Sequence, residues 1–490
     1  MARIAVIGAG MGAMAAAARL AVAGHRVMVH ERSGTFGGAV GAFERDGFAF
    51  DTGPGLLHLP AVYRDLFLKT GKQPLESRIE MAQVDPASRH LFADGTAVSL
   101  PNASRGGVVA ALDSALGAGT GERWGDFLKR ARECWDRSRR PLLEEPLWPN
   151  WQVLGREPYP ALRQRRMLRV RQAATLAQVG AWELADPRLA SLLDVCALSY
   201  GLDPRRAPAA AALLPYMEHT FGAWYVRGGM RALARAVYER CLERGVDFTF
   251  GSEVVGVLER DGRAAGLELA DGSTVEADEV VAAAGRGGLG DREPWRDGDV
   301  RPGAADQAPG RFTMLMALRG ARASEAAHQT VVHSPDTAAE AAAVFGGGPA
   351  GRPTVMVLRP DDPTTRPDQD HEAVTLTATA PGDPAHWSEK AVRDCFAGAL
   401  ATAAEQVIPD IRERLLWHEV LTPAETGRVR PPALAGSGGA YLRPSNSTRL
   451  PGLHLAGGWS HPGGGLAHAG MSGALVAGLI VEGEDFRGSQ

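Results

Sequence analysis

A glycine-rich turn at the start of the chain constrains the fold more than any other feature. Residues 3–7 predict a buried strand and residues 13–23 a helix, joined by Gly8-Ala9-Gly10-Met11-Gly12-Ala13. This segment matches G-x-G-x-x-G/A. Gly8 permits the tight turn, Gly10 lets the backbone approach a pyrophosphate, and Ala13 permits close packing of helix on strand. The free N–H groups of the helix N-terminus would bind the phosphates.

A second strand over residues 26–30 completes a βαβ unit, and Glu31 ends that strand 23 positions after Gly8. A carboxylate at this place can accept hydrogen bonds from ribose hydroxyls. It also disfavours a 2′-phosphate, which argues against NADP. The start of the chain therefore predicts a dinucleotide-binding domain.

The chain continues as Arg32-Ser33-Gly34-Thr35-Phe36-Gly37-Gly38-Ala39, and the spacing Glu-x5-Gly-Gly resembles that of the two-dinucleotide-binding flavoproteins. Near the C-terminus the chain runs Leu455-Ala456-Gly457-Gly458-Trp459-Ser460-His461-Pro462-Gly463-Gly464-Gly465. This segment resembles the closing strand-turn-helix of the same flavoproteins. Together the two segments indicate FAD as the cofactor.

Three further segments resemble the phytoene desaturase family, and residues 203–208, like residues 461–465 of the C-terminal segment, resemble its actinobacterial members. The three segments are residues 47–54 (GFAFDTGP), 203–208 (DPRRAP) and 224–230 (WYVRGGM). The chain departs from the family at Ala39, where an arginine or lysine is usual, and at Ala467-His468, where the family tends to carry proline.

The resemblance implies an α/β fold in which a Rossmann-like FAD domain carries an inserted α+β substrate domain, as in amine oxidases and phytoene desaturases. We expect the FAD domain to comprise residues 1–105, 226–290 and 441–490, and the substrate domain residues 106–225 and 291–440. Residues 105–217 are largely helical in pattern. The expected cofactor contacts are Gly8, Gly10, Met11, Gly12, Ala13, Glu31, Arg32, Gly37, Gly38, Ala39, Val254, Gly457, Gly458, Gly465, Leu466 and Ala467.

Four residues are candidates for chemistry: His461, His468, Tyr225 and Arg227. The histidines flank the presumed flavin turn and could take up a proton, since imidazole titrates near neutrality. Each could instead be structural, as a backbone-bonding histidine, a packed aromatic or a surface arginine. No cluster of metal-ligand type stands out, so we expect no metal.

Alternating apolar residues over 312–318 could line a lipid pocket, but a half-buried strand shows the same alternation and is the better interpretation. Arginines recur over residues 163–171, close behind Trp148 and Trp151. They predict either contact with an anionic membrane surface or a solvated helix face.

Composition narrows the class of protein. A net charge of −4 gives no electrostatic case for nucleic acid. The four cysteines are scattered without a pairing motif, which favours a reducing cytoplasm, with the inner face of the membrane as the place of any peripheral contact.

The expected function is FAD-dependent desaturation of an apolar isoprenoid, carotenoid-like or polyene substrate, by hydride transfer to flavin N5. The alternatives are a saturase, an isomerase or an amine oxidase of the same fold, or a lipid-carrying protein without catalysis. Since a second dinucleotide fingerprint is not found, oxygen or a quinone is the expected electron acceptor. No sequence feature predicts whether the protein is a monomer or an oligomer.

Overall fold

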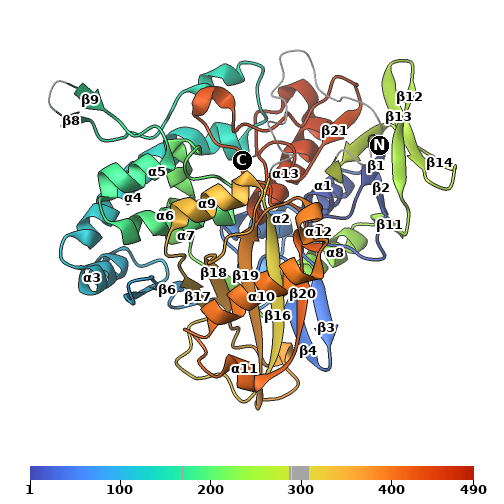
Figure 1. Ribbon diagram of the computed structural model, residues 1–490. Helices are drawn as coiled ribbons and strands as arrows, with labels where there is room; N and C mark the ends of the chain where they lie inside the picture. Colours follow the sequence, from blue (N-terminus) through green and yellow to red (C-terminus); the bar gives the residue numbers. More distant parts are fainter. Residues whose placement is uncertain (167–168, 286–288, 290–307, 490) are drawn as a thin grey trace.

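The computed structural model describes residues 1–166, 169–285, 289 and 308–489. The expected domain boundary between residues 290 and 291 lies outside them. Figure 1 shows three regions: a parallel sheet with its helices on the right, beside the N-terminus, a helical region on the left, and a second sheet below both.

The first region is a five-stranded sheet in the order β11-β2-β1-β15-β21, with every neighbouring pair parallel. Its strands are β1 (Arg3–Ile7), β2 (Arg26–Glu31), β11 (Asp247–Phe250), β15 (Glu279–Ala282) and β21 (Leu453–Leu455). The associated helices are α1 (Met11–Val22), α8 (Met230–Glu243) and α13 (Leu466–Glu482). The sheet thus joins both ends and the middle of the chain, which confirms the Rossmann-like fold.

Small residues allow α1 and α13 to pack closely. A Cβ atom on Gly12 would lie 2.8 Å from the carbonyl oxygen of Ala469, and one on Gly473 would lie 2.4 Å from that of Gly12. These distances are too short for any side chain, so Gly12 serves the contact between the two helices.

The second sheet has seven strands in the order β20-β16-β19-β18-β17-β6-β7. The strands are β6 (Ser88–Leu91), β7 (Ala97–Leu100), β16 (Gly310–Arg319), β17 (Gln329–Val332), β18 (Val355–Leu358), β19 (His371–Ala380) and β20 (Leu415–Leu421). β6 pairs with β17, so β6 and β7 belong to this sheet and not to the parallel one, although they precede the expected boundary at residue 105. Both strands have only four residues, too few for a clear alternation. The division into domains stays a prediction.

Helix α10 (Lys390–Ala404) covers one face of this sheet. Phe312, Met314, Met316 and Leu318 of β16 point to that face and pack with Phe396 and other side chains of the helix. The core interpretation of the alternating residues is therefore correct.

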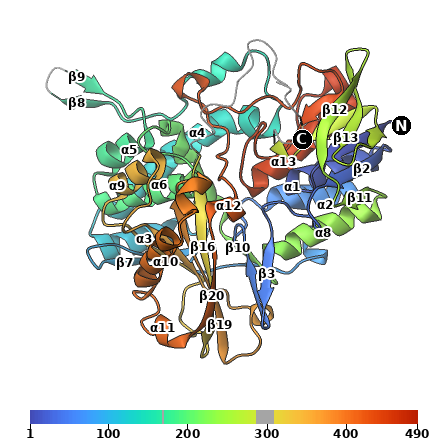
Figure 2. The ribbon, with the colours of Figure 1, turned by 45° about the vertical axis from the view of Figure 1, so that its right-hand side comes forward.

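The helical region contains α3 (Arg105–Leu116), α4 (Thr120–Arg139), α5 (Leu176–Val179), α6 (Pro187–Ser199) and α7 (Leu213–Phe221). The arginine-rich segment is not a helix: β8 (Gln164–Arg166) and β9 (Arg169–Arg171) form an antiparallel hairpin. Figures 1 and 2 show this hairpin projecting from the body of the molecule. In the described part of the chain, no helix combines the length and apolarity needed to cross a membrane.

The α-helices and strands not named so far belong to neither of the two large sheets. They are β3 (Ala42–Arg45), β4 (Phe48–Asp51), α2 (Ala61–Gly71), β5 (Met81–Gln83), β10 (Trp224–Val226), β12 (Val254–Arg260), β13 (Arg263–Leu269), β14 (Thr274–Glu276), α9 (Thr337–Gly346), α11 (Ile411–Arg414) and α12 (Pro423–Thr426).

Candidate functional site

A cavity of about 590 Å³ extends from the glycine turn of the parallel sheet to the helical region and the second sheet. Most of the expected cofactor residues line one end of it: Gly10, Met11, Gly12, Ala13, Gly37, Gly38, Ala39, Gly457, Gly458, Gly465, Leu466 and Ala467. The fold thus brings the N-terminal and C-terminal motifs to one place.

The turn before α1 leaves room for a ligand. Gly10 caps the helix in an extended conformation, and a Cβ atom added there would meet nothing within 4 Å. Gly8 adopts φ +92°, which favours glycine. An open space at a helix N-terminus suits the pyrophosphate of a dinucleotide.

The carboxylate of Glu31 is fixed beside this turn. It accepts hydrogen bonds from the backbone N–H groups of Ala9 (2.7 Å) and Ser33 (2.8 Å). A carboxylate has about four lone-pair positions, so acceptor capacity remains for ribose hydroxyls. Arg32 is exposed and Val254 is packed in the core behind the sheet, and neither lines the cavity.

Arg231 on α8 stabilises the loop that carries the paired glycines, a role that the sequence motifs did not indicate. Its guanidinium donates to the carbonyl oxygens of Phe36 and Val40 and lies 4.0 Å above the Phe36 ring. Asp51 in turn accepts hydrogen bonds from the N–H groups of Met230 (2.8 Å) and Arg231 (3.2 Å) at the start of α8. Burial raises the pKa of Asp51 to about 6. These contacts join segments far apart in sequence, so local spacing gives no signal for them.

The two histidines of the C-terminal turn lie in different surroundings. His461 is completely buried, its Nε2 atom lies 3.0 Å from the carbonyl oxygen of Glu145, and its side chain does not line the cavity. His468 lies in the first turn of α13 and does line the cavity. Burial lowers the pKa of each imidazole to about 4, so both are neutral near pH 7. Of the two, His468 is the one placed to touch a ligand.

Tyr225 and Arg227 lie together outside this cavity, along a neighbouring hollow. The Tyr225 hydroxyl donates to Asp362 (2.9 Å), and Arg227 pairs with Glu80 (2.9 Å) and more distantly with Asp362 (3.8 Å). The fold does not bring them to His468, and their chemical role stays a prediction.

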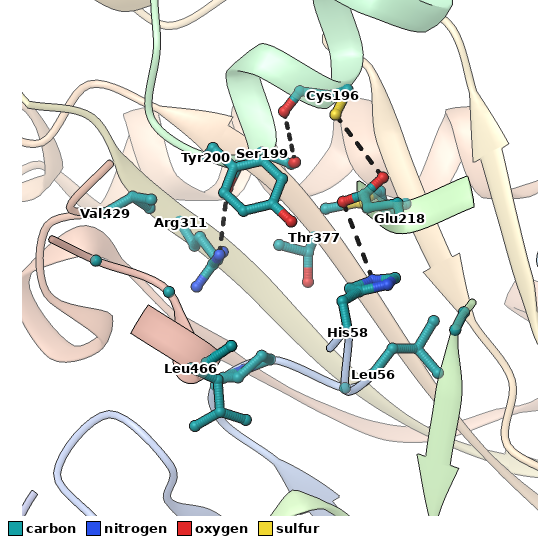
Figure 3. A pocket seen from close by; sticks show the side chains of 18 of the residues that line it. Leu56, His58, Cys196, Ser199, Tyr200, Glu218, Arg311, Thr377, Val429 and Leu466 are labelled. Atoms are coloured by element: carbon teal, nitrogen blue, oxygen red, sulfur yellow. Dashed lines mark hydrogen bonds and ion pairs between the residues drawn. The ribbon is translucent and has the colours of Figure 1, made fainter. Parts of the chain in front are cut away.

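The other end of the cavity is mainly apolar, with a polar cluster that the sequence did not reveal. The apolar lining includes Leu56, Leu192, Val195, Met217, Val331, Met356 and Leu358. Figure 3 shows the polar side chains, which come from α6, α7, β16, β19 and the segment before α2: His58, Cys196, Ser199, Tyr200, Glu218, Arg311 and Thr377.

Within this cluster Glu218 is the main acceptor. The Cys196 thiol lies 3.7 Å from one of its oxygens and His58 Nε2 lies 4.0 Å from the other. The cysteines at 134, 196, 241 and 395 are all free. Among the described residues, no three His, Cys, Asp or Glu side chains are grouped to hold a metal ion.

The shape and lining of the cavity fit FAD. The open space at Gly10, the helix N-termini of α1 and α13, and the adjoining acceptor Glu31 provide donors for phosphates and an acceptor for ribose. When bound, a flavin supplies the hydride-accepting chemistry that the side chains of this site do not provide themselves.

Comparisons with known proteins agree with this fit. The chain is 27% identical to 4,4′-diapolycopene oxygenase of a Methylomonas species, with 98% of each chain covered. It is 28% identical to a neurosporene-forming phytoene desaturase of Rhodobacter capsulatus, with 98% of this chain and 94% of the relative covered. Putrescine oxidase shares the fold at a TM-score of 0.65 and 15% identity, over 98% of this chain and 99% of that structure.

The model of one protein family, described as flavin containing amine oxidoreductase, matches residues 14–481. That match spans nearly the whole chain, and the relatives cover it equally well. The resemblance to carotenoid desaturases and the expectation of an FAD-dependent oxidoreductase are thereby confirmed. The chain belongs to the flavin-containing amine oxidoreductase family.

Proposed function

We propose that the chain desaturates a carotenoid-like polyene, with FAD as hydride acceptor. The observation that carries the proposal is the continuity of the cavity, which joins the glycine turns at Gly10 and Gly457 to the apolar lining around Leu192 and Met217. A long apolar chain fits such a space, and the carotenoid desaturases among the relatives act on molecules of that kind.

The residues of the chain have separate roles in this proposal. The helix N-termini and Glu31 bind the cofactor, and the apolar lining orients the polyene and excludes water. Desaturation removes a hydride and a proton from adjacent carbons. His468 is the proposed proton acceptor, because its neutral imidazole lines the cavity next to the glycine turn that starts α13.

Oxygen or a membrane quinone is the proposed terminal electron acceptor. Membrane contact through the β8–β9 hairpin would give access to a quinone and to a water-insoluble substrate. The exposed side chains of Leu162 (42%) and Val170 (65%) on and beside this hairpin support such contact.

Anaerobic reduction of the bound flavin tests the function. The purified holoprotein is mixed with a panel of acyclic carotenoid precursors, and bleaching of the visible flavin absorbance is followed, with the desaturated product identified by chromatography. Reduction by at least one polyene is expected. Rapid reduction by NADPH, together with no reduction by any polyene, would replace the desaturase proposal with a saturase.

A further inference from the structure

The cavity face of the second sheet contains one cation among neutral side chains. Arg311 lies near the start of β16, opposite Thr379 of β19, and lines the cavity together with Thr375 and Thr377. Successive side chains of a strand alternate between faces, so Arg311 points away from the α10 core that holds its neighbour Phe312. Its partly exposed surface therefore faces the cavity.

Few protein groups compensate the positive charge of the Arg311 guanidinium. It donates one hydrogen bond to the Ser199 carbonyl oxygen (3.3 Å), and no carboxylate among the described residues lies within ion-pair distance of it. Removal from water lowers its pKa, and Tyr200 is the group that opposes this shift. A guanidinium has five N–H donors, so most of its hydrogen-bonding capacity remains unused.

The nearby carboxylate does not act as its counter-ion. Glu218 is engaged with Cys196 and His58. It also lies beside the Tyr200 hydroxyl, whose pKa is raised by burial and further by this carboxylate. Figure 3 shows the Tyr200 ring between Arg311 and Glu218. Most of the guanidinium's N–H donors have no protein partner and lie on the cavity side, where an oxygen atom of a bound molecule can accept from them.

We propose that the substrate carries an oxygen acceptor, which Arg311 binds inside the cavity. The inference rests on the proposed desaturase function and narrows its substrate to a polyene with a carboxylate, carbonyl or hydroxyl oxygen. The apolar lining around Leu192 and Val195 contacts the chain of this molecule, and Arg311 contacts its oxygen. A plain hydrocarbon would leave the guanidinium with the Ser199 carbonyl oxygen as its acceptor and add none.

The test compares pairs of polyenes of equal length, one a hydrocarbon and the other with a terminal carboxylate, aldehyde or hydroxyl group. Anaerobic flavin reduction gives the apparent dissociation constant and limiting rate for each. In the parent protein, at least one oxygenated polyene should bind about 10- to 100-fold more tightly than its hydrocarbon, the usual effect of a hydrogen bond to a charged group. Comparing the three end groups distinguishes an ionic partner from a neutral one.

The variant Arg311→Gln should remove this preference, so that the two members of each pair bind with dissociation constants within about twofold of each other. Arg319→Gln is the matched control, because Arg319 lies on the same strand with its side chain exposed, outside the cavity. It should leave both constants unchanged.

Equal binding of both members of every pair by the parent would overturn the inference. An equal loss of affinity for both members of a pair in Arg311→Gln would overturn it too, because Arg311 would then serve the fold. A variant that loses FAD or shifts the flavin spectrum but keeps the preference would show that Arg311 serves the cofactor, which also overturns the inference. If no polyene reduces the flavin, the desaturase proposal fails instead. In that case a fluorescence titration still compares the binding of the two members of each pair, and so tests the preference for oxygen separately from the reaction.

Discussion

The buried imidazole of His461 makes the stability of the protein depend on pH in a calculable way. The residue is completely buried, and burial lowers its pKa from 6.5 to about 4. Between these values the unfolded chain binds a proton that the folded protein does not, so stability is lost as the pH falls from 6.5 towards 4. Between pH 7 and about pH 5, this one group should remove about 2 kcal/mol of unfolding free energy.

The substitution His461→Gln isolates this contribution. A glutamine amide can still donate to the Glu145 carbonyl oxygen that His461 Nε2 contacts, but it does not titrate. Urea unfolding of the FAD-bound protein at about pH 7 and pH 5 gives the pH-dependent loss for parent and variant, which should be about 2 kcal/mol smaller in the variant. The histidines that do not interact with His461 contribute equally in both proteins and cancel. The pKa of His468 is lowered mainly by burial and further by the charge of His461, so its smaller change in the variant acts in the same direction.

His418→Gln is the control, because His418 is exposed on β20. It should lose the same stability as the parent. The reasoning is refuted if His461→Gln and the parent lose equal free energy over this interval, which would mean that the folded protein accepts the proton. His461→Gln should also reduce its flavin at the parent rate, because the side chain does not line the cavity.

Four further variants test the cofactor site, the proton acceptor and the membrane contact. Gly10→Val should abolish FAD binding, measured as flavin absorbance per protein, because its side chain would occupy the open space at the turn. Glu31→Ala should weaken FAD binding by about 1.5–3 kcal/mol in a titration of the apoprotein; unchanged flavin after dialysis would contradict its role. His468→Ala should slow flavin reduction by about 10²–10⁴-fold with FAD retained, whereas a parent-like rate in stopped-flow assays would show the histidine to be structural. Replacing three arginines of residues 163–171 by serine should reduce cosedimentation with anionic liposomes, and equal sedimentation would speak against membrane contact.

The cofactor end of the cavity was predictable because its signals are local. The spacing from Gly8 to Glu31 fixes a strand, a turn, a helix and a second strand, and these elements determine where a pyrophosphate can bind. The C-terminal glycines could be joined to this turn only through the resemblance to flavoproteins. The structure places Gly10 and Gly457 on one cavity.

The polar parts of the site depend on contacts between distant segments. Arg231 stabilises the loop at Phe36, and Asp51 stabilises the helix that carries Arg231, but neither pair has a spacing that a motif could reveal. The hairpin over residues 164–171 was missed for a different reason. Its frequent arginines suit a solvated helix and an exposed strand pair equally well, so tertiary context decides between them.

The two faces of β16 and β19 explain why substrate preference can vary independently of the fold. Phe312 and Leu376 point to α10 and form the core that holds the sheet, whereas Arg311 and Thr377 point to the cavity. Adjacent residues of one strand therefore have different roles, because the period of a strand is two. Substitutions at the cavity-facing positions change the ligand's surroundings without creating voids beneath α10. If Arg311 binds a substrate oxygen, then the polarity of this one face, and not the shared cofactor site, determines which polyene the enzyme accepts.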